Sequence, residues 1–245
     1  MTNEPSQGIW QYDLAANRLQ AVVPCSDFPS VYAKNIKPFN YYIKSLSDTN
    51  LTCAIFPPAN YDRHKKYPVV MGNTRFVVAV NGVHGRQWVP CVAAAGAYVV
   101  IVERKQWSKG LEQWGDDIMA AYNSLKEEPG IDTSRVYLFS SSAETRYMGN
   151  LLTKSPGLWK GGIFLNPGAL PDFFKSPMNQ SRPRILISVG GDEQEEDRLK
   201  KYQAGNLNQG VVVETFIHPG EGHHLVGNAA QLERTRALMH FIFEE

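Results

Sequence analysis

Three separate loops of the sequence carry a serine, an aspartate and a histidine that could together perform nucleophilic catalysis. Ser142 follows the apolar run 136–139, Asp192 follows a second apolar run and a Gly-Gly pair, and His223 follows a third. A serine hydroxyl attacks an acyl carbon effectively when a histidine accepts its proton and a carboxylate orients the imidazole. These residue types therefore predict an acyl-transfer site, provided that the fold brings the three loops together.

Ser142 is expected on a sharp turn between a strand and a helix. Three successive serines end at Ser142, between the β-favouring run 136–139 and the helix-compatible run 143–153. This layout is typical of a nucleophile elbow, where the serine of G-x-S-x-G is exposed above the sheet. Ser140 and Glu144 replace the two glycines here, although a carboxylate is electrostatically favourable in a first helical turn. The alternative interpretation is an ordinary polar loop between a strand and a helix.

The order of the three residues favours a catalytic triad. Asp192 comes 50 residues after Ser142 (192 minus 142), and His223 comes 31 residues after Asp192 (223 minus 192). Each interval is long enough for intervening secondary structure, and the order serine, acid, histidine is that of the α/β-hydrolases. His224 is a competing base beside His223.

The acid has competitors as well. Glu193, Glu195 and Glu196 follow Asp192 closely. We select Asp192 because it comes immediately after the strand and its Gly-Gly turn. The glutamates fit the solvated first turns of the helix that follows.

Alternating strand and helix signals predict the scaffold that must position these loops. Apolar runs predict strands at 67–72, 97–103, 136–139, 161–165, 184–189 and 211–217, and helical periodicity predicts helices at 85–97, 114–126, 143–153, 195–204 and 227–244. Short connections between alternating elements predict an α/β fold with a doubly wound, mostly parallel sheet, whose functional loops lie at the carboxyl ends of the strands.

Two hairpins are expected before this alternating part. Residues 39–45 and 51–56 alternate polar and apolar side chains, which predicts an antiparallel hairpin at the edge of the sheet. Residues 9–13 and 18–22 predict a second, more N-terminal hairpin. We therefore divide the chain into an N-terminal extension at 1–37, made of a short hairpin and a linker, and a catalytic domain at 38–245.

Several phrases resemble the catalytic domain of the prolyl oligopeptidase family of serine peptidases. They are Pro-Pro-x-x-Tyr-Asp from Pro57, Lys-Lys-Tyr-Pro-Val-Val from Lys65, and Gly-Glu-Gly-His ending at His223. The resemblance begins at Pro38 and implies an α/β-hydrolase fold with Ser142 as nucleophile, Asp192 as acid and His223 as base. The compact spacing also resembles the dienelactone-hydrolase branch of the same superfamily. The resemblance implies peptide bonds next to a small or proline residue as substrates. An ester has a better leaving group and therefore demands less of a site whose elbow departs from the usual pattern.

The oxyanion of such a reaction needs backbone donors. The N–H of Ala143, together with that of Gly72 or Asn73, is expected to supply them. Relatives carry His-Gly-Gly or a tyrosine near the second position, and this chain has neither. A backbone donor requires no particular side chain, so the oxyanion hole remains predicted.

Candidate residues for a substrate pocket are Glu144, Phe173 and Phe174. The two phenylalanines lie in a loop rich in proline, glycine and phenylalanine. Aromatic residues of such loops pack against their own surface as often as they line a pocket.

The composition limits the remaining classes of function. The chain has 245 residues, of which 43% are hydrophobic and 20% charged, as expected for one globular α/β domain. A net charge of +1 gives no reason to expect nucleic acid or an anionic membrane as a partner. Three widely spaced cysteines indicate neither a disulfide framework nor a zinc site. We expect no metal and no cofactor, and the sequence leaves open a homo-oligomer.

The location expected from the sequence is the cytoplasm. The first residues lack the basic and apolar pattern of a signal peptide, and no apolar run has the length of a transmembrane helix.

Two functions follow from these observations. The first is a serine hydrolase that acts on an ester or a short peptide through an acyl-enzyme. The second is a catalytically impaired protein of the same fold that binds a ligand or a partner, which Glu144 and the altered oxyanion loop favour.

Overall fold

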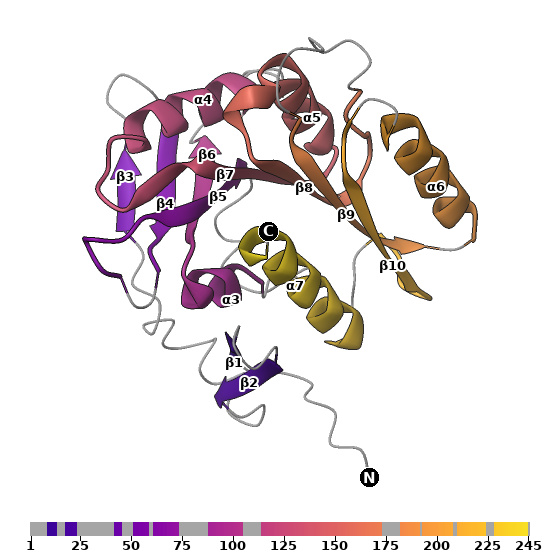
Figure 1. Ribbon diagram of the computed structural model, residues 1–245, viewed down its shortest axis with the longest axis horizontal. Helices are drawn as coiled ribbons and strands as arrows, with labels where there is room; N and C mark the ends of the chain where they lie inside the picture. The colour runs from indigo at the N-terminus through magenta and orange to yellow at the C-terminus, as the bar shows by residue number, and fades with distance from the viewer. Residues whose placement is uncertain are drawn as a thin grey trace.

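A mostly parallel β-sheet forms the centre of the molecule (Figure 1). The computed structural model describes residues 9–13, 18–23, 42–45, 51–58, 61–73, 88–104, 114–172, 182–191, 193–207, 210–223 and 228–244. Within these residues, an eight-stranded sheet has the order β10-β9-β8-β7-β5-β6-β4-β3. Its strands are β3 (Tyr42–Ser45), β4 (Leu51–Phe56), β5 (Tyr67–Asn73), β6 (Tyr98–Arg104), β7 (Ile131–Ser142), β8 (Gly161–Pro167), β9 (Arg184–Gly191) and β10 (Val213–Pro219).

The strand directions confirm the predicted sheet. Strand β4 runs antiparallel to β3 and to β6, whereas the pairs from β6 through β10 are parallel. The hairpin predicted at the edge is therefore β3 and β4. Parallel neighbours place the carboxyl ends of β5, β7, β8, β9 and β10 at the same edge of the sheet, where functional loops of α/β folds lie.

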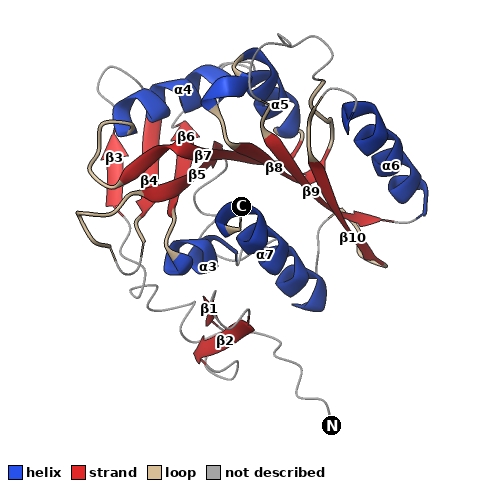
Figure 2. Ribbon diagram, in the orientation of Figure 1, coloured by secondary structure: helices blue, strands red, loops and turns tan. Residues whose placement is uncertain are grey.

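Helices cover both faces of the sheet (Figures 1 and 2). One face carries α4 (Trp114–Leu125), α5 (Thr145–Lys154) and α6 (Glu193–Leu207), and the other carries α3 (Trp88–Ala95) and α7 (Asn228–Phe243). A short 3-10 helix, η3 (Pro156–Leu158), follows α5.

The apolar strands pack into one core on each face. Val69 and Met71 of β5 join the cluster under α4 and α5, whereas Val70 joins the cluster under α3 and α7. Successive residues of a strand point to opposite faces, so a strand covered on both faces needs an almost continuous apolar run. Each buried aliphatic side chain contributes about 1.5–3 kcal/mol.

Some element boundaries differ from the prediction. Helix α5 begins at Thr145 instead of residue 143, because Ala143 and Glu144 form the turn that leaves β7. Helix α6 continues past Gly205 to Leu207. The buried Asn206 donates a side-chain hydrogen bond to the carbonyl of Tyr202, which supports this last turn.

The predicted N-terminal hairpin is present. Strands β1 (Ile9–Asp13) and β2 (Arg18–Val23) form an antiparallel, two-stranded sheet, and β1 lies beside α3. In Figure 1 this hairpin lies on the side of the molecule that carries α3 and α7.

No helix in the described part of the chain combines the length and apolar character needed to cross a membrane.

Candidate active site

Ser142 is the last residue of β7 and has a backbone φ of +54°. Positive φ is uncommon for residues other than glycine and persists where surrounding contacts hold it. Here the carbonyl of Ser142 accepts hydrogen bonds from the Thr145 hydroxyl at 2.6 Å and from the Gly168 N–H at 3.0 Å. The strand, sharp turn and helix therefore have the geometry of a nucleophile elbow.

His223 reaches Ser142 from the loop that follows β10. Its Nε2 lies 2.9 Å from the Ser142 Oγ, although 81 residues separate the two in the sequence. The hydrogen bond expected between these side chains is present. When Nδ1 carries the imidazole proton, Nε2 is free to accept the proton of the hydroxyl.

The third predicted residue, Asp192, lies outside the described residues, as does the competing base His224. All three competing acids belong to α6 (Glu193–Leu207), and the side chains of two of them are described. Glu195 pairs with Arg198 and Glu196 pairs with Lys200 within α6. These ion pairs occupy the two glutamates on the surface of the helix.

Of the predicted oxyanion donors, Ala143 follows Ser142 in the chain, and Gly72 and Asn73 end the strand adjacent to β7. Ala143 is the exposed turn residue that follows Ser142, and Asn73 ends β5, the strand adjacent to β7. Gly72 pairs with both Ile101 and Phe139 inside the sheet. Asn73 pairs with Val102 of β6, one residue nearer the carboxyl end of β5.

Gly72 has a packing role that the sequence analysis did not assign. A Cβ at this position would lie 2.2 Å from the carbonyl oxygen of Phe139 and 2.5 Å from its ring. Glycine is therefore needed for the close approach of β5 and β7.

The two departures from the elbow pattern are accommodated locally. Glu144 is half-buried at the N-cap of α5, in a helical conformation and without a side-chain capping bond. Ser140 is 1% exposed, and its hydroxyl has no hydrogen-bond partner among the described residues. Neither residue prevents the turn at Ser142.

A buried polar network beneath the site was missed by the sequence analysis. Arg234 of α7 donates from Nε to the Ser188 Oγ at 2.7 Å, and the same oxygen lies 3.0 Å from the His218 Nε2. Asn166, a loop residue in the prediction, belongs to β8 and bonds to Arg234 and to the backbone of His223. The sequence signal for this network was Arg234, a charged residue among the apolar positions of the last predicted helix.

The network changes the titration of its members. Burial lowers the pKa of the Arg234 guanidinium to about 10, while the carboxylate of Glu221 opposes this shift. Burial and the charge of Arg234 lower the pKa of His218, while Glu233 and Glu221 oppose that change. Arg234 is therefore charged and His218 neutral at pH 7.

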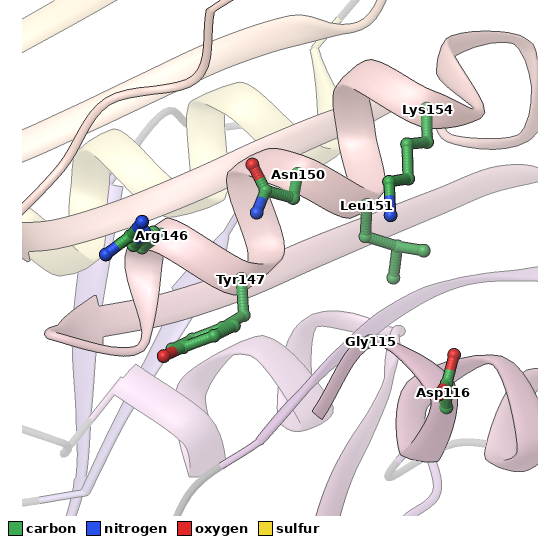
Figure 3. A pocket seen from close by; sticks show the side chains of 7 residues that line it. All are labelled: Gly115, Asp116, Arg146, Tyr147, Asn150, Leu151 and Lys154. Carbon is green, nitrogen blue, oxygen red and sulfur yellow. The ribbon is translucent and has the colours of Figure 1, made fainter. Parts of the chain in front are cut away.

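A pocket of about 390 Å³ lies between the start of α4 and the exposed face of α5 (Figure 3). Its described lining residues are Gly115, Asp116, Arg146, Tyr147, Asn150, Leu151 and Lys154. Neither Ser142 nor His223 is among them. We therefore place the candidate active site at the Ser142–His223 contact and not in this pocket. Phe173 and Phe174, the predicted pocket residues, lie outside the described residues.

No protein-family model and no curated protein matches this sequence. Solved structures do match it. Porphyromonas gingivalis dipeptidyl peptidase 4 is 17% identical over 93% of this chain, with a TM-score of 0.60. Thermogutta terrifontis esterase 2 phosphoramylated by tabun is 14% identical over 87% of this chain, with a TM-score of 0.63. The chain has the α/β-hydrolase fold.

The α/β-hydrolase domain described above spans very different shares of these proteins. It covers 97% of the esterase, but 39% of the P. gingivalis peptidase. A Bacteroides ovatus ATCC 8483 protein, provisionally named dipeptidyl aminopeptidase IV, is 17% identical with a TM-score of 0.61; 83% of this chain matches 35% of that one. These matches agree with the fold that the resemblance to the prolyl oligopeptidase family implies.

Proposed function

We propose that this chain is a serine hydrolase that cleaves an ester or a peptide bond through an acyl-enzyme. The observation that carries the proposal is the 2.9 Å contact between Ser142 Oγ and His223 Nε2 at a turn with positive φ. A serine activated by an adjacent general base is the minimal requirement of nucleophilic acyl transfer. The α/β-hydrolase fold of known esterases and peptidases supports the same assignment.

The mechanism has two halves. Ser142 Oγ bonds to the acyl carbon while its proton passes to His223 Nε2, and the carbonyl electron pair moves to the oxygen. The N–H of Ala143, with that of Asn73 or Gly72, stabilises this oxyanion. His223 then protonates the leaving alcohol or amine, and water releases the acyl group by the reverse proton transfers. Asp192 orients the imidazole and stabilises its charged form.

Activated esters are the substrates that suit this site best. An aryl ester has a better leaving group than an amide, so it requires less stabilisation of the oxyanion. Glu144 stands beside the nucleophile where the elbow pattern has glycine, and its charge opposes the oxyanion. We therefore expect slow turnover of short-chain aryl esters, and weaker activity on unactivated peptides.

A second candidate is a non-catalytic protein that keeps the fold and binds a ligand or partner. Glu144 is the observation that favours it, because a carboxylate at this position weakens the oxyanion hole. The retained Ser142–His223 contact favours catalysis.

Labelling with a fluorophosphonate probe tests the proposal without knowledge of the substrate. Esterase 2 of T. terrifontis has been captured phosphorylated by paraoxon, so organophosphorus reagents suit this fold. We expect the probe to label Ser142, as located by peptide mass spectrometry. Ser142→Ala should abolish labelling and lower aryl ester turnover by about 10⁴-fold or more.

Ser141→Ala is the matched control, because it removes the neighbouring hydroxyl from the same strand. It should retain labelling. Persistent labelling of folded Ser142→Ala would overturn the assignment of the nucleophile. Absence of labelling in the folded wild-type protein would favour the binding protein instead.

A further inference from the structure

We infer that Asn166 is a positioning residue of the proposed site. Its amide joins the end of β9, after which Asp192 follows, to the loop that carries His223. This role rests on the proposed function, because it acts through the histidine that serves as base.

The amide of Asn166 makes three hydrogen bonds, two as an acceptor and one as a donor. Its Oδ1 accepts from the Gly190 N–H at 3.0 Å and from Arg234 Nη2 at 3.1 Å, and its Nδ2 donates to the carbonyl of His223. A flipped amide would direct its NH₂ at two donors and its oxygen at an acceptor. The surroundings therefore define the orientation of the amide.

The end of β9 and the segment before His223, which Asn166 joins, are in direct backbone contact. A Cβ on Gly190 would lie 2.2 Å from the carbonyl oxygen of Gly222 and 2.7 Å from that of Glu221. The absence of a side chain at Gly190 thus allows the segment before His223 to pack on the end of β9. The side-chain amide of Asn166 therefore holds together two segments whose close approach depends on the glycine at position 190.

Arg234 holds Asn166 from the opposite side. Arg234 is 3% exposed, and its guanidinium also donates to the Ser188 Oγ and to the Ser188 carbonyl. Asn166 itself has a φ of +46°, a conformation that asparagine adopts more readily than most residues. The side-chain amide of Asn166 is therefore held in place and should restrict movement of the loop that carries His223.

The consequence concerns the base. Fixing the carbonyl of His223 limits the positions of its imidazole relative to Ser142. Misplacement of a catalytic group by about 1 Å costs on the order of 100-fold in rate. Loss of the amide donor should therefore slow the chemical step and leave substrate binding nearly unchanged.

Asn166→Asp tests this role with the smallest change of shape. Aspartate also tolerates positive φ and keeps an acceptor for Gly190 and Arg234, but it directs an oxygen at the carbonyl of His223. We expect kcat for an aryl ester to fall about 10-fold to 100-fold, with KM within about twofold of wild type. The control Tyr137→Phe removes a buried hydroxyl that bonds to Ile242, outside the site, and should retain both constants.

Hydrogen exchange gives a readout that is independent of turnover. The amides of residues 220–223 should exchange faster in Asn166→Asp, whereas the amide of Gly190 should keep its protection because its acceptor remains. A second variant, Asn166→Gly, permits the positive φ but removes the whole amide, so both segments should exchange faster.

The outcomes separate this role from the proposed function. If the probe labels wild-type Ser142 and folded Asn166→Asp keeps wild-type kcat, KM and exchange at 220–223, the role of Asn166 is overturned and the hydrolase assignment stands. If the folded wild-type protein is not labelled, the proposed function fails and this role fails with it. Slower kcat, unchanged KM and faster exchange together support the role.

Discussion

Gly72 was predicted for its backbone amide, but its most direct constraint is the space that a side chain would occupy. The carbonyl and ring of Phe139 fill the position of a Cβ. The example shows that a glycine near a site can serve packing, whether or not it also donates a hydrogen bond.

We predict that Gly72→Ala destabilises the protein by about 3 kcal/mol, because the added methyl group meets backbone as well as a ring. For a chain of this size, that change lowers Tm by about 6–12 °C. Gly115→Ala is the matched control, since a Cβ there meets nothing within 4 Å and its φ is not positive. Calorimetry of both variants should show a large loss for the first and no loss for the second; equal Tm values would contradict the packing argument.

Glu144 gives a prediction about rate. Glu144 follows the proposed nucleophile by two residues, so in the proposed mechanism its carboxylate should act on the oxyanion and on the histidinium, with opposite effects on the two charges. We expect the oxyanion effect to dominate because the backbone donors cannot move to compensate. Glu144→Gly should therefore raise aryl ester turnover several-fold, corresponding to about 1 kcal/mol, with a small loss of stability.

Glu144→Gln separates charge from flexibility, because it removes the charge and keeps the size of the side chain. It should raise turnover in the same direction at neutral pH. A large fall in rate for both folded variants would show that the carboxylate is a working part of the site.

At the scale of elements, the elbow depends on contacts between the start of α5 and the loop after β8. The buried Thr145 hydroxyl donates to the carbonyl of Ser142 and accepts from the Ala169 N–H at 3.2 Å. One side chain thus connects the strained turn to a neighbouring loop.

We predict that Thr145→Val destabilises the protein by about 1–3 kcal/mol, because it leaves a partly buried carbonyl and a partly buried N–H without this partner. Release of the turn should also slow probe labelling of Ser142. Thr153→Val removes a hydroxyl that bonds to the Asn150 carbonyl on the exposed side of the same helix, and it serves as the control. Urea unfolding and labelling kinetics should change in the first variant alone; unchanged labelling in Thr145→Val would show that the turn is held by other contacts.

The elements themselves were largely predictable, for a physical reason. Strands such as β6 and β9 are covered on both faces and must be apolar almost throughout, which makes them visible in the sequence. The turn at Ser142 was less visible, because a positive φ at a serine depends on the partners Thr145 and Gly168. The prediction of a helix from residue 143 was wrong for that reason.

At the scale of the whole molecule, the Ser142–His223 contact was predictable from the order of strands, whereas the network of Asn166 and Arg234 was not. The carboxyl ends of parallel strands meet at one edge of the sheet, so the order of the strands indicates that the loops of Ser142 and His223 lie close together. Asn166 and Arg234 are 68 residues apart, and nothing local to either residue predicts the other. The role of Asp192 stays a prediction.

Stability of the whole molecule should depend on pH through His218. Burial and the charge of Arg234 lower its pKa in the folded state, outweighing Glu221 and the largely exposed Glu233. The unfolded chain, with a histidine pKa of about 6.5, then binds the proton more readily. Stability is therefore fully present above about pH 6.5 and declines as pH falls from there toward the lower pKa of the folded state.

We predict that the wild-type protein loses more unfolding free energy between pH 7 and pH 5 than His218→Gln does, as measured by urea unfolding at both values. The variant should be less stable at pH 7, by about 1 kcal/mol, because it disturbs the bond to Ser188. The exposed His64 provides the control variant His64→Gln, which should follow the wild-type dependence. Equal pH dependence in His218→Gln would exclude this histidine as the cause.

The distance along the chain between Ser142 and His223 has a consequence for biosynthesis. A chain emerging from a ribosome completes the elbow long before the base is synthesised, and Arg234, which anchors the network behind that base, comes later still. Ser142 of the nascent protein should consequently not react with the probe, although most strands of the sheet have already been translated. Probe labelling of stalled chains should begin when the segment containing α7 has left the exit tunnel, so reactivity would report that His223 and the network of Arg234 have folded onto the elbow.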